Sequence, residues 1–127
     1  MIYVETVSEY QAKGEVARIY AAIREHLGSL PSIFRLMSAE PRILAEAWRA
    51  YPYAMENGSL GRAERELLAL AVSRVNSCRY GMDGATNKLL DMGMPSSQIE
   101  AMFRADPGIE ARHLTLIALA ENVSRDP

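Results

Sequence analysis

An all-α fold is the fold class that this sequence predicts, and three observations lead to it. Apolar residues recur with helical spacing along the chain, and no stretch alternates convincingly as a strand. Residues that suit helix starts and ends, namely serine, proline, glycine and asparagine, separate the periodic segments. At 127 residues, with 49% hydrophobic and 24% charged residues, the chain has the size and composition of one globular domain. We therefore expect a single helical domain over residues 1–127.

The first expected helix covers residues 9–27. Ser8 and Gln11 have the spacing of a capping box at its start, and Gly28 is suited to ending it. Its apolar stripe is expected to consist of Val16, Ile19, Tyr20, Ile23 and Leu27. A short helix over residues 32–38 follows it.

The third expected helix begins at Pro41. Pro52 should kink or end this helix, because a proline inside a helix removes one backbone donor and clashes with the preceding turn. Trp48, Tyr51 and Tyr53 cluster around Pro52. We expect these three aromatic residues to pack inside the domain, with a subunit interface as the competing interpretation.

Four more helices are expected in the second half of the chain. Their ranges are about 61–75, 78–92, 95–103 and 106–123. Asn76 and Ser77 separate the first two of these helices and can cap the second, which Gly93 should end. The inner face of the last helix is expected to carry Ile109, Leu116, Ile117, Ala120 and Val123.

Charge and composition exclude several classes of protein. The net charge is −2 without a basic patch, so neither nucleic acid nor an anionic membrane is an expected partner. No run approaches the roughly 20 apolar residues of a membrane span, and the N-terminus does not read as a signal peptide. The single cysteine excludes an internal disulfide and favours a cytoplasmic setting. His26 and His113 lack a second ligand at metal spacing, so we expect no metal and no cofactor.

The most informative segment covers residues 64–85. Glu66 lies on an expected helix, and Cys78 follows it by twelve residues. Cys78 should lie in the first turn of the next helix, where free amide groups and the helix dipole favour a thiolate by roughly 0.3–1 kcal/mol. Arg74 and Arg79 are close enough in sequence to add to this effect, whereas a nearby Glu66 carboxylate would oppose it.

Each candidate residue also has an ordinary structural interpretation. Cys78 could be a buried and inert small hydrophobe. Glu66 flanks an apolar stripe, so it either lines a site or faces solvent in the first turns of its helix. Asp83 is interpreted as a solvated acid, and Tyr80 either lines a cavity or packs. His113 is either an ordinary core or surface histidine or a substitute base for Cys78.

The segment resembles the alkylhydroperoxidase D / carboxymuconolactone decarboxylase family. The resemblance rests on the run E-L-L-A-L-A-V-S-R-V-N-S-C-R-Y, together with H-L-G-S-L-P and A-E-P-R-I-L-A-E-A-W upstream, and covers about residues 9–93. Redox members of the family carry a glutamate, then C-x-x-C, then a histidine four residues after the second cysteine. Glu66 and Cys78 match this pattern, whereas Gly81 replaces the second cysteine and Ala85 replaces the histidine.

The resemblance implies an alkylhydroperoxidase D-like helical bundle that assembles as a trimer or a hexamer and uses a small-molecule or thiol partner. It also implies a peroxiredoxin-type antioxidant activity, in which the glutamate and histidine resemble a proton relay serving two thiols. Gly81 cannot resolve an oxidised Cys78 and Ala85 cannot move a proton, so weak or absent peroxidase turnover is expected. Restoring Gly81→Cys and Ala85→His together should recover some thiol-dependent peroxide reduction.

Two other functions stay open on the same fold. One is a non-catalytic, oligomeric binding or scaffold protein, which the two replacements favour. The other is a carboxymuconolactone decarboxylase-like enzyme, which needs no C-x-x-C pair but requires a base in its cavity. Longer relatives continue past the point where this chain stops, so it is either a short member of the family or lacks C-terminal helices.

Overall fold

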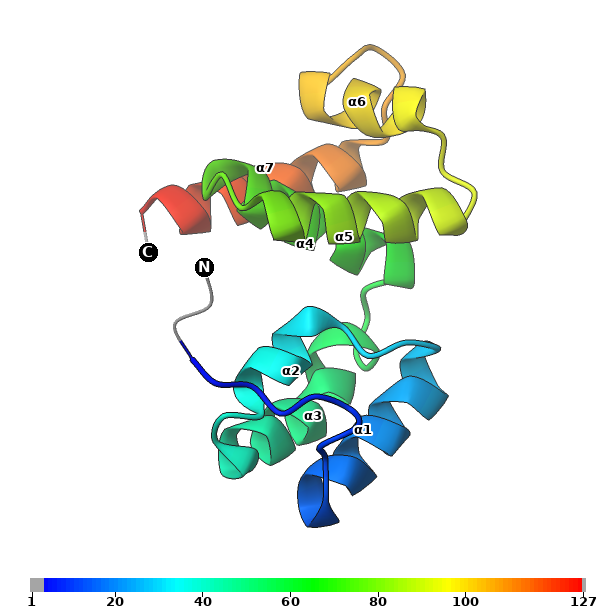
Figure 1. Cartoon of the computed structure of the whole chain (residues 1–127). Coiled ribbons are helices and arrows are strands. Elements are labelled where there is room, and N and C mark those ends of the chain that lie inside the picture. The colour runs from blue at the N-terminus through cyan, green and yellow to red at the C-terminus, as the bar shows by residue number, and fades with distance from the viewer. Residues whose placement is uncertain (1–3, 127) are drawn as a thin grey trace. The chain divides into compact units, whose positions relative to one another are not determined.

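The computed structural model describes residues 4–126. Met1–Tyr3 and Pro127, on which the expectations about the two ends of the chain depend, lie outside this range. The described residues form seven α-helices and no strand, which confirms the predicted all-α class (Figure 1). The chain divides into two compact units, Met1–Gly58 and Ser59–Pro127. The single domain expected from the sequence stays a prediction.

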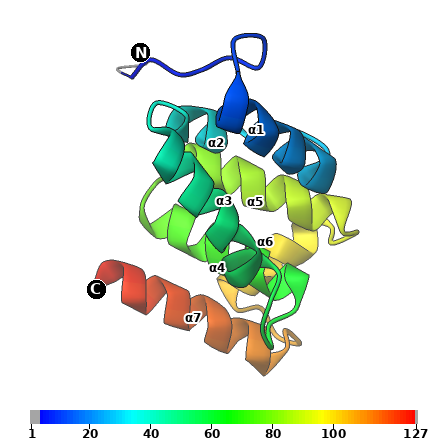
Figure 2. The same cartoon turned by 90° about the horizontal axis from the view of Figure 1, so that it is seen from below.

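The first unit contains three helices around one small core. They are α1 (Gly14–Leu27), α2 (Ser32–Met37) and α3 (Pro41–Met55). Helices α1 and α2 both pack against α3, and the three helices can be followed in Figure 2. The buried residues of this core are Val16, Tyr20, Ile23, Phe34 and Leu44. The predicted apolar stripe of α1 therefore faces this core, with Ile19 and Leu27 packed at its edge.

Helix α1 begins five residues later than the sequence predicts. The expected pair forms, since the Ser8 hydroxyl donates to Gln11 Oε1 at 2.7 Å, but it closes only a single turn. Gly14 then adopts φ +57°, a left-handed conformation that an α-helix cannot contain in its interior. The prediction of a helix from residue 9 is wrong because the backbone at Gly14 separates the Ser8 turn from the helix.

Helix α3 continues through Pro52 to Met55, so Pro52 does not end the helix, and of the two expected effects only the kink stays a prediction. The Pro52 carbonyl accepts hydrogen bonds from the backbone N–H groups of Glu56 and Asn57, at 2.9 and 2.8 Å, which extends the helix by one more turn. Trp48 and Tyr51 stack with ring centroids 5.6 Å apart and pack on the core, as expected. Tyr53 does not pack inside, because it is 75% exposed.

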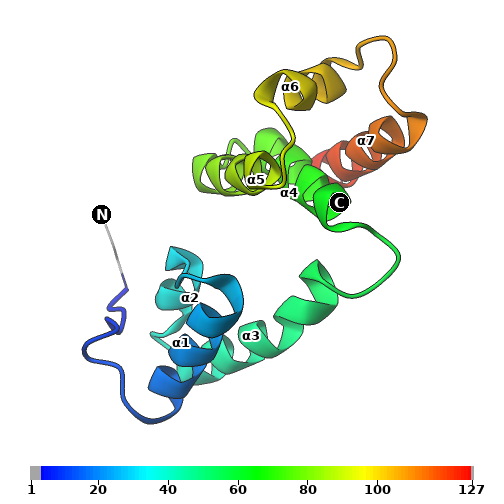
Figure 3. The same cartoon turned by 90° about the vertical axis from the view of Figure 1, so that its right-hand side faces the viewer.

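The second unit contains the four remaining helices. They are α4 (Arg62–Val75), α5 (Arg79–Asp91), α6 (Ser96–Arg104) and α7 (Ala111–Arg125). Helix α4 lies between α5 and α7, and α6 packs on α7 (Figures 1 and 3). The buried core of this unit consists of Leu67, Leu70, Ala71, Ala85, Leu89, Ile99, Met102, Ile117 and Ala120. Within residues 4–126, no helix has both the length and the hydropathy needed to cross a membrane.

Helix α7 begins at Ala111 rather than at Asp106. Asp106 is held by Arg104 of the preceding helix at 2.7 Å, and Gly108 adopts φ +92°, so the chain makes a turn here before the helix starts. Ile117 and Ala120 face the core as predicted. Val123 does not, because it is 58% exposed.

Candidate functional site

The turn between α4 and α5 places the cysteine. Ser77 adopts φ +52°, a left-handed conformation that is uncommon for a residue with a side chain. The backbone N–H of Cys78 donates to the Ser73 carbonyl at 2.8 Å, which ties the start of α5 to the last turn of α4. Cys78 is itself the N-cap residue of α5, so the predicted capping by Asn76 or Ser77 is wrong.

Cys78 is exposed, which excludes its interpretation as a buried, inert hydrophobe. It lies where the unpaired amide groups of a helix start favour an anion. The two arginines that the sequence places near it have other partners. Arg79 lies 3.8 Å from Asp83, with both side chains largely in solvent, and Arg74 lies 3.4 Å from Glu100 of α6. Because Cys78 is exposed, its thiol is accessible to a dissolved oxidant.

At Gly81, which the family resemblance matches to the second cysteine, the Ser73 side chain lies where a Cβ would be. A Cβ atom built on Gly81 would lie 2.2 Å from Ser73 Oγ and 3.1 Å from Ser73 Cβ. The same Cβ would lie 3.6 Å from Cys78 Sγ, so Gly81 stands directly beside the thiol. The Ser73 hydroxyl donates to the Ala69 carbonyl at 2.7 Å, which fixes its direction. Gly81 thus allows α5 to approach α4 closely.

Glu66 is bound by a lysine that sequence reasoning did not single out. Its side chain is buried, with the residue only 4% exposed, and Lys88 Nζ of α5 lies 3.1 Å from Glu66 Oε1. Lys88 follows Cys78 by ten residues, which places its backbone roughly 15 Å along the axis of α5. Glu66 and Cys78 lie on consecutive helical segments, but the carboxylate bonds near the end of α5 opposite the cysteine. Lys88 follows Gly81 by seven residues and Ala85 by three, so the three residues share one face of α5. This spacing is the sequence signal that could have indicated Lys88 as a candidate.

Ala85, which the family resemblance matches to the histidine, belongs to the core. It is 4% exposed and packs in the same buried cluster as Leu67, Leu70 and Leu89. The site residues taken from the sequence are therefore distributed along α5: Cys78 at its exposed start, Ala85 in the packed middle, and the partner of Glu66 near its end.

Two of the other polar candidates, Asp83 and His113, form ion pairs with residues other than the cysteine. Tyr80 and Asp83 are exposed on α5. His113 Nδ1 lies 3.8 Å from Glu110 at the start of α7, and His113 also contributes to the electrostatics of Glu64 at the start of α4. Glu64 lies at the N-terminal end of α4, whereas Cys78 follows its C-terminal end. The structure therefore does not support His113 as a substitute base. Among the described residues, no group of three or more His, Cys, Asp or Glu is placed to hold a metal ion.

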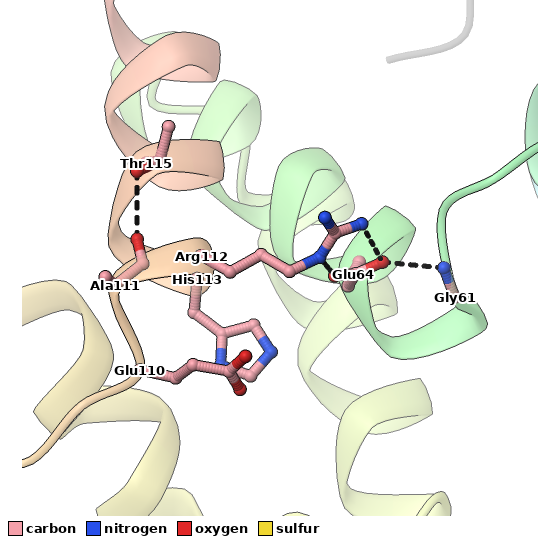
Figure 4. A network of polar contacts seen from close by, with 7 residues as sticks. All are labelled: Gly61, Glu64, Glu110, Ala111, Arg112, His113 and Thr115. Atoms are coloured by element: carbon pink, nitrogen blue, oxygen red, sulfur yellow. Dashed lines mark hydrogen bonds and ion pairs between the residues drawn. The ribbon is translucent and has the colours of Figure 1, made fainter.

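Glu64 forms a second polar network that joins α4 to α7 (Figure 4). Its carboxylate accepts a hydrogen bond from the Gly61 backbone N–H at 2.7 Å and is bound by the guanidinium of Arg112, 48 residues further along the chain. The hydrogen bond from Arg112, followed by that from Gly61, lowers the pKa of Glu64 from 4.5 to about 2. This network joins the first turn of α4 to the first turn of α7.

A Glu64→Gln substitution is expected to flatten the acid dependence of stability. The lowered pKa means that the unfolded chain takes up a proton at Glu64 more readily than the folded chain does. The stabilisation by Glu64 is therefore complete above about pH 4.5 and is lost as the pH falls towards 2. Glutamine can still accept from Gly61 but carries no charge for Arg112. Urea denaturation between pH 7 and pH 2 measures the difference.

The control for this prediction is Glu100→Gln, which removes the more exposed pair Arg74–Glu100 at 3.4 Å, because the Glu100 side chain is 53% exposed and that of Glu64 only 13%. Pairs of this kind contribute little to stability. Equal slopes of stability against pH for Glu64→Gln and the unaltered protein between pH 4.5 and 2 would contradict the prediction.

Comparison with known proteins identifies the class of fold and then the family. The structure is similar to the crystal structure of the alkylhydroperoxidase AhpD core from Rhodospirillum rubrum, with a TM-score of 0.70, 28% identity, and coverage of 98% of this chain and 88% of that one. The fold is thus an alkylhydroperoxidase D-like helical fold. The model of the carboxymuconolactone decarboxylase family matches residues 43–121, which is more than half of the chain. The protein belongs to the carboxymuconolactone decarboxylase family.

A curated relative gives the same assignment. The chain is 29% identical over 91 residues to an alkyl hydroperoxide reductase of Mycobacterium tuberculosis, a match that covers 72% of this chain. The match covers 26% of the mycobacterial protein, so this chain spans about a quarter of the length of that relative. The family and fold predicted from the sequence are confirmed. The family match includes Glu66, Cys78, Gly81 and Ala85.

Proposed function

We propose that this protein is a one-thiol member of its family, in which Cys78 is the only redox-active group and peroxide turnover is weak or absent. The observation that carries the proposal is the space beside Cys78. A Cβ at position 81 would lie 2.2 Å from Ser73 Oγ, so the chain has no second thiol there, and a side chain at this position would require the Ser73 hydroxyl or α5 to move. The similarity to an alkyl hydroperoxide reductase supports peroxide as the class of oxidant.

The chemistry available to Cys78 stops after one step. The thiolate attacks the peroxide oxygen, the O–O bond breaks, and Cys78 becomes a sulfenic acid while the peroxide leaves as an alcohol or water. A second thiol must then displace water from the sulfenic acid to form a disulfide, and a further thiol must release the cysteine. Cys78 is the only cysteine of the chain, so both thiols have to come from outside it.

Proton transfer is equally limited. Ala85 has no titratable group, and the Glu66 carboxylate is bound to Lys88. General acid–base help requires a group within hydrogen-bond reach of the reacting atoms, typically for a gain of about 10²–10⁴ in rate. No residue taken from the family pattern meets this requirement at Cys78, which accounts for the expected low activity.

The test measures peroxide consumption by the purified chain with and without a small thiol. Without added thiol, consumption is expected to stop at about one peroxide per Cys78, because nothing in the chain regenerates the thiol. A trap for sulfenic acid should label the unaltered protein, and Cys78→Ser should remove both the label and the consumption. Sustained turnover without added thiol that depends on Cys78 would contradict the proposal.

A non-catalytic binding or scaffold function on the same fold is the second candidate. The packed Ala85 and the ion pair between Glu66 and Lys88 favour it, because both residues that the family pattern matches to a proton relay make structural contacts here. It predicts that peroxide oxidises Cys78 no faster than it oxidises a free thiol such as glutathione. The rate at which the sulfenic acid trap labels Cys78 therefore separates the two candidates in a single experiment.

A further inference from the structure

We infer that Glu100 and Phe103 of α6 hold the Arg74 guanidinium away from Cys78, so that the thiol reacts more slowly than it would with a cation beside it. The inference rests on the proposed function, in which Cys78 is the redox-active group. It deepens that function by naming two positioning residues that control the fraction of Cys78 present as thiolate, the form that attacks a peroxide.

The turn after α4 brings the backbone of Arg74 close to that of Cys78. The backbone N–H of Ser77 donates to the Arg74 carbonyl at 3.2 Å, and that of Cys78 donates to the Ser73 carbonyl at 2.8 Å. With Ser77 in the left-handed conformation, these two bonds form a Schellman motif, which folds the chain back onto the last turn of the helix. Arg74 and Cys78 are therefore separated by roughly one helical pitch, about 5–6 Å, which the long stem of an arginine can span.

Two side chains of α6 direct the guanidinium elsewhere. Arg74 Cζ lies 4.4 Å from the centroid of the Phe103 ring, and Arg74 Nη1 lies 3.4 Å from Glu100 Oε1. Glu100 and Phe103 are three residues apart, so they lie on the same face of α6, and Phe103 packs against the core of the second unit. A cation over an aromatic ring and an exposed ion pair each favour the bound position by a factor of roughly two to five. Together they keep the guanidinium on α6 most of the time.

The two arginines nearest Cys78 in sequence are both paired with carboxylates. Arg74 is paired with Glu100, and Arg79 lies 3.8 Å from Asp83. A paired cation favours a neighbouring thiolate less than an unpaired one, because the carboxylate cancels most of its field. A single unpaired charge about 8 Å away in water changes the thiolate fraction roughly twofold, and a closer approach changes it more. Salt weakens this effect, since the screening length falls from about 30 Å at 0.01 M to about 3 Å at 1 M.

The experiment measures the rate at which iodoacetamide alkylates Cys78 at pH 7 and at about pH 10, where most of an ordinary cysteine thiol is ionised. The thiolate sulfur forms a bond to the carbon of the reagent, iodide leaves with the electron pair of the C–I bond, and the thiol proton passes to the buffer. The reagent is uncharged, and Cys78 is the only cysteine of the chain. Accessibility affects both rates alike, so their ratio reports the thiolate fraction at pH 7.

Glu100→Gln is expected to raise this ratio roughly twofold at about 0.01 M ionic strength, because it leaves the Arg74 charge unpaired. Glu100→Gln/Phe103→Leu should raise it up to about fivefold, since the guanidinium then loses both contacts and can approach the thiol. Adding Arg74→Met to either variant should return the ratio to near that of the unaltered protein. In about 1 M salt both rises should be nearly lost.

The matched control is Glu110→Gln, which changes the net charge by the same amount. Glu110 lies 3.8 Å from His113 at the start of α7, and His113 acts on Glu64 in the first turn of α4. Cys78 follows the other end of α4, whose 14 residues span about 21 Å. Glu110→Gln should therefore change the ratio less than about 1.3-fold.

Each outcome decides the inference. A rise with Glu100→Gln that Arg74→Met removes supports it. If Glu100→Gln changes the ratio no more than Glu110→Gln does, the inference is overturned. It is also overturned if the rise survives Arg74→Met, because another group would then be its source.

Circular dichroism checks that each variant is folded. If Phe103→Leu does not fold, Glu100→Gln with and without Arg74→Met still decides the outcome. Peroxide is not used, so this experiment and the test of the proposed function can fail separately.

Discussion

Replacing Ala85 with histidine is expected to destabilise the protein by roughly 2–5 kcal/mol, the sum of an overpacking cost and the cost of burying an incompletely bonded polar group. Ala85 is 4% exposed and packs among Leu67, Leu70 and Leu89, so an imidazole has to displace buried side chains. The Glu66 carboxylate, a natural partner for the imidazole, is already bound to Lys88. Urea or thermal unfolding followed by circular dichroism measures the loss.

Ala118→His is the control for this substitution, because Ala118 lies on α7 and is exposed. It carries the helix-propensity cost of histidine without the packing cost, a few tenths of a kcal/mol to about 0.7. Equal stabilities of the two variants would show that the space around Ala85 adapts more easily than its burial indicates. The restoration of activity expected from Gly81→Cys with Ala85→His thus requires room at both positions, at Ser73 for the first and in the core for the second.

Lys88→Met is expected to cost roughly 1–3 kcal/mol, because it leaves the buried Glu66 carboxylate without its cation. The lower end of the range reflects the partial exposure of Lys88, whose side chain is 43% accessible, so that water can replace part of the interaction. Lys88→Arg should restore most of the loss. The double variant Glu66→Gln/Lys88→Met should lose less stability than the two single variants lose together, since it removes both charges.

The thermodynamic cycle formed by these variants measures the coupling between Glu66 and Lys88 directly. Arg79→Met is the matched control, because the Arg79–Asp83 pair lies on the same helix with both side chains largely exposed and should contribute about 0–1 kcal/mol. Additive effects of Glu66→Gln and Lys88→Met would contradict the assignment of Glu66 to a structural ion pair. The carboxylate would then be free for another function.

Helical periodicity in the sequence predicted which elements form, and it misplaced their ends where backbone conformation decides. The apolar stripe of α1 faces its core as expected, because a period of 3.6 residues fixes one face of a helix. Helix α1 starts only at Gly14, which adopts a left-handed conformation. The sequence could not predict this start, because a glycine permits a left-handed backbone without requiring it. The continuation of α3 through Pro52 depends on carbonyl partners that the sequence pattern does not specify.

The sequence by itself determined the family, the identity of the single thiol, and the absence of the second cysteine and the histidine at Gly81 and Ala85. Only the tertiary structure decided what surrounds these positions. Ser73 lies beside position 81 and Lys88 binds Glu66 because the short left-handed turn at Ser77 sets the register of α4 against α5. The periodicity within α5 indicates that Lys88 lies on the same face as Gly81 and Ala85, but the residue that it meets on α4 is fixed by this register and not by any spacing along the chain.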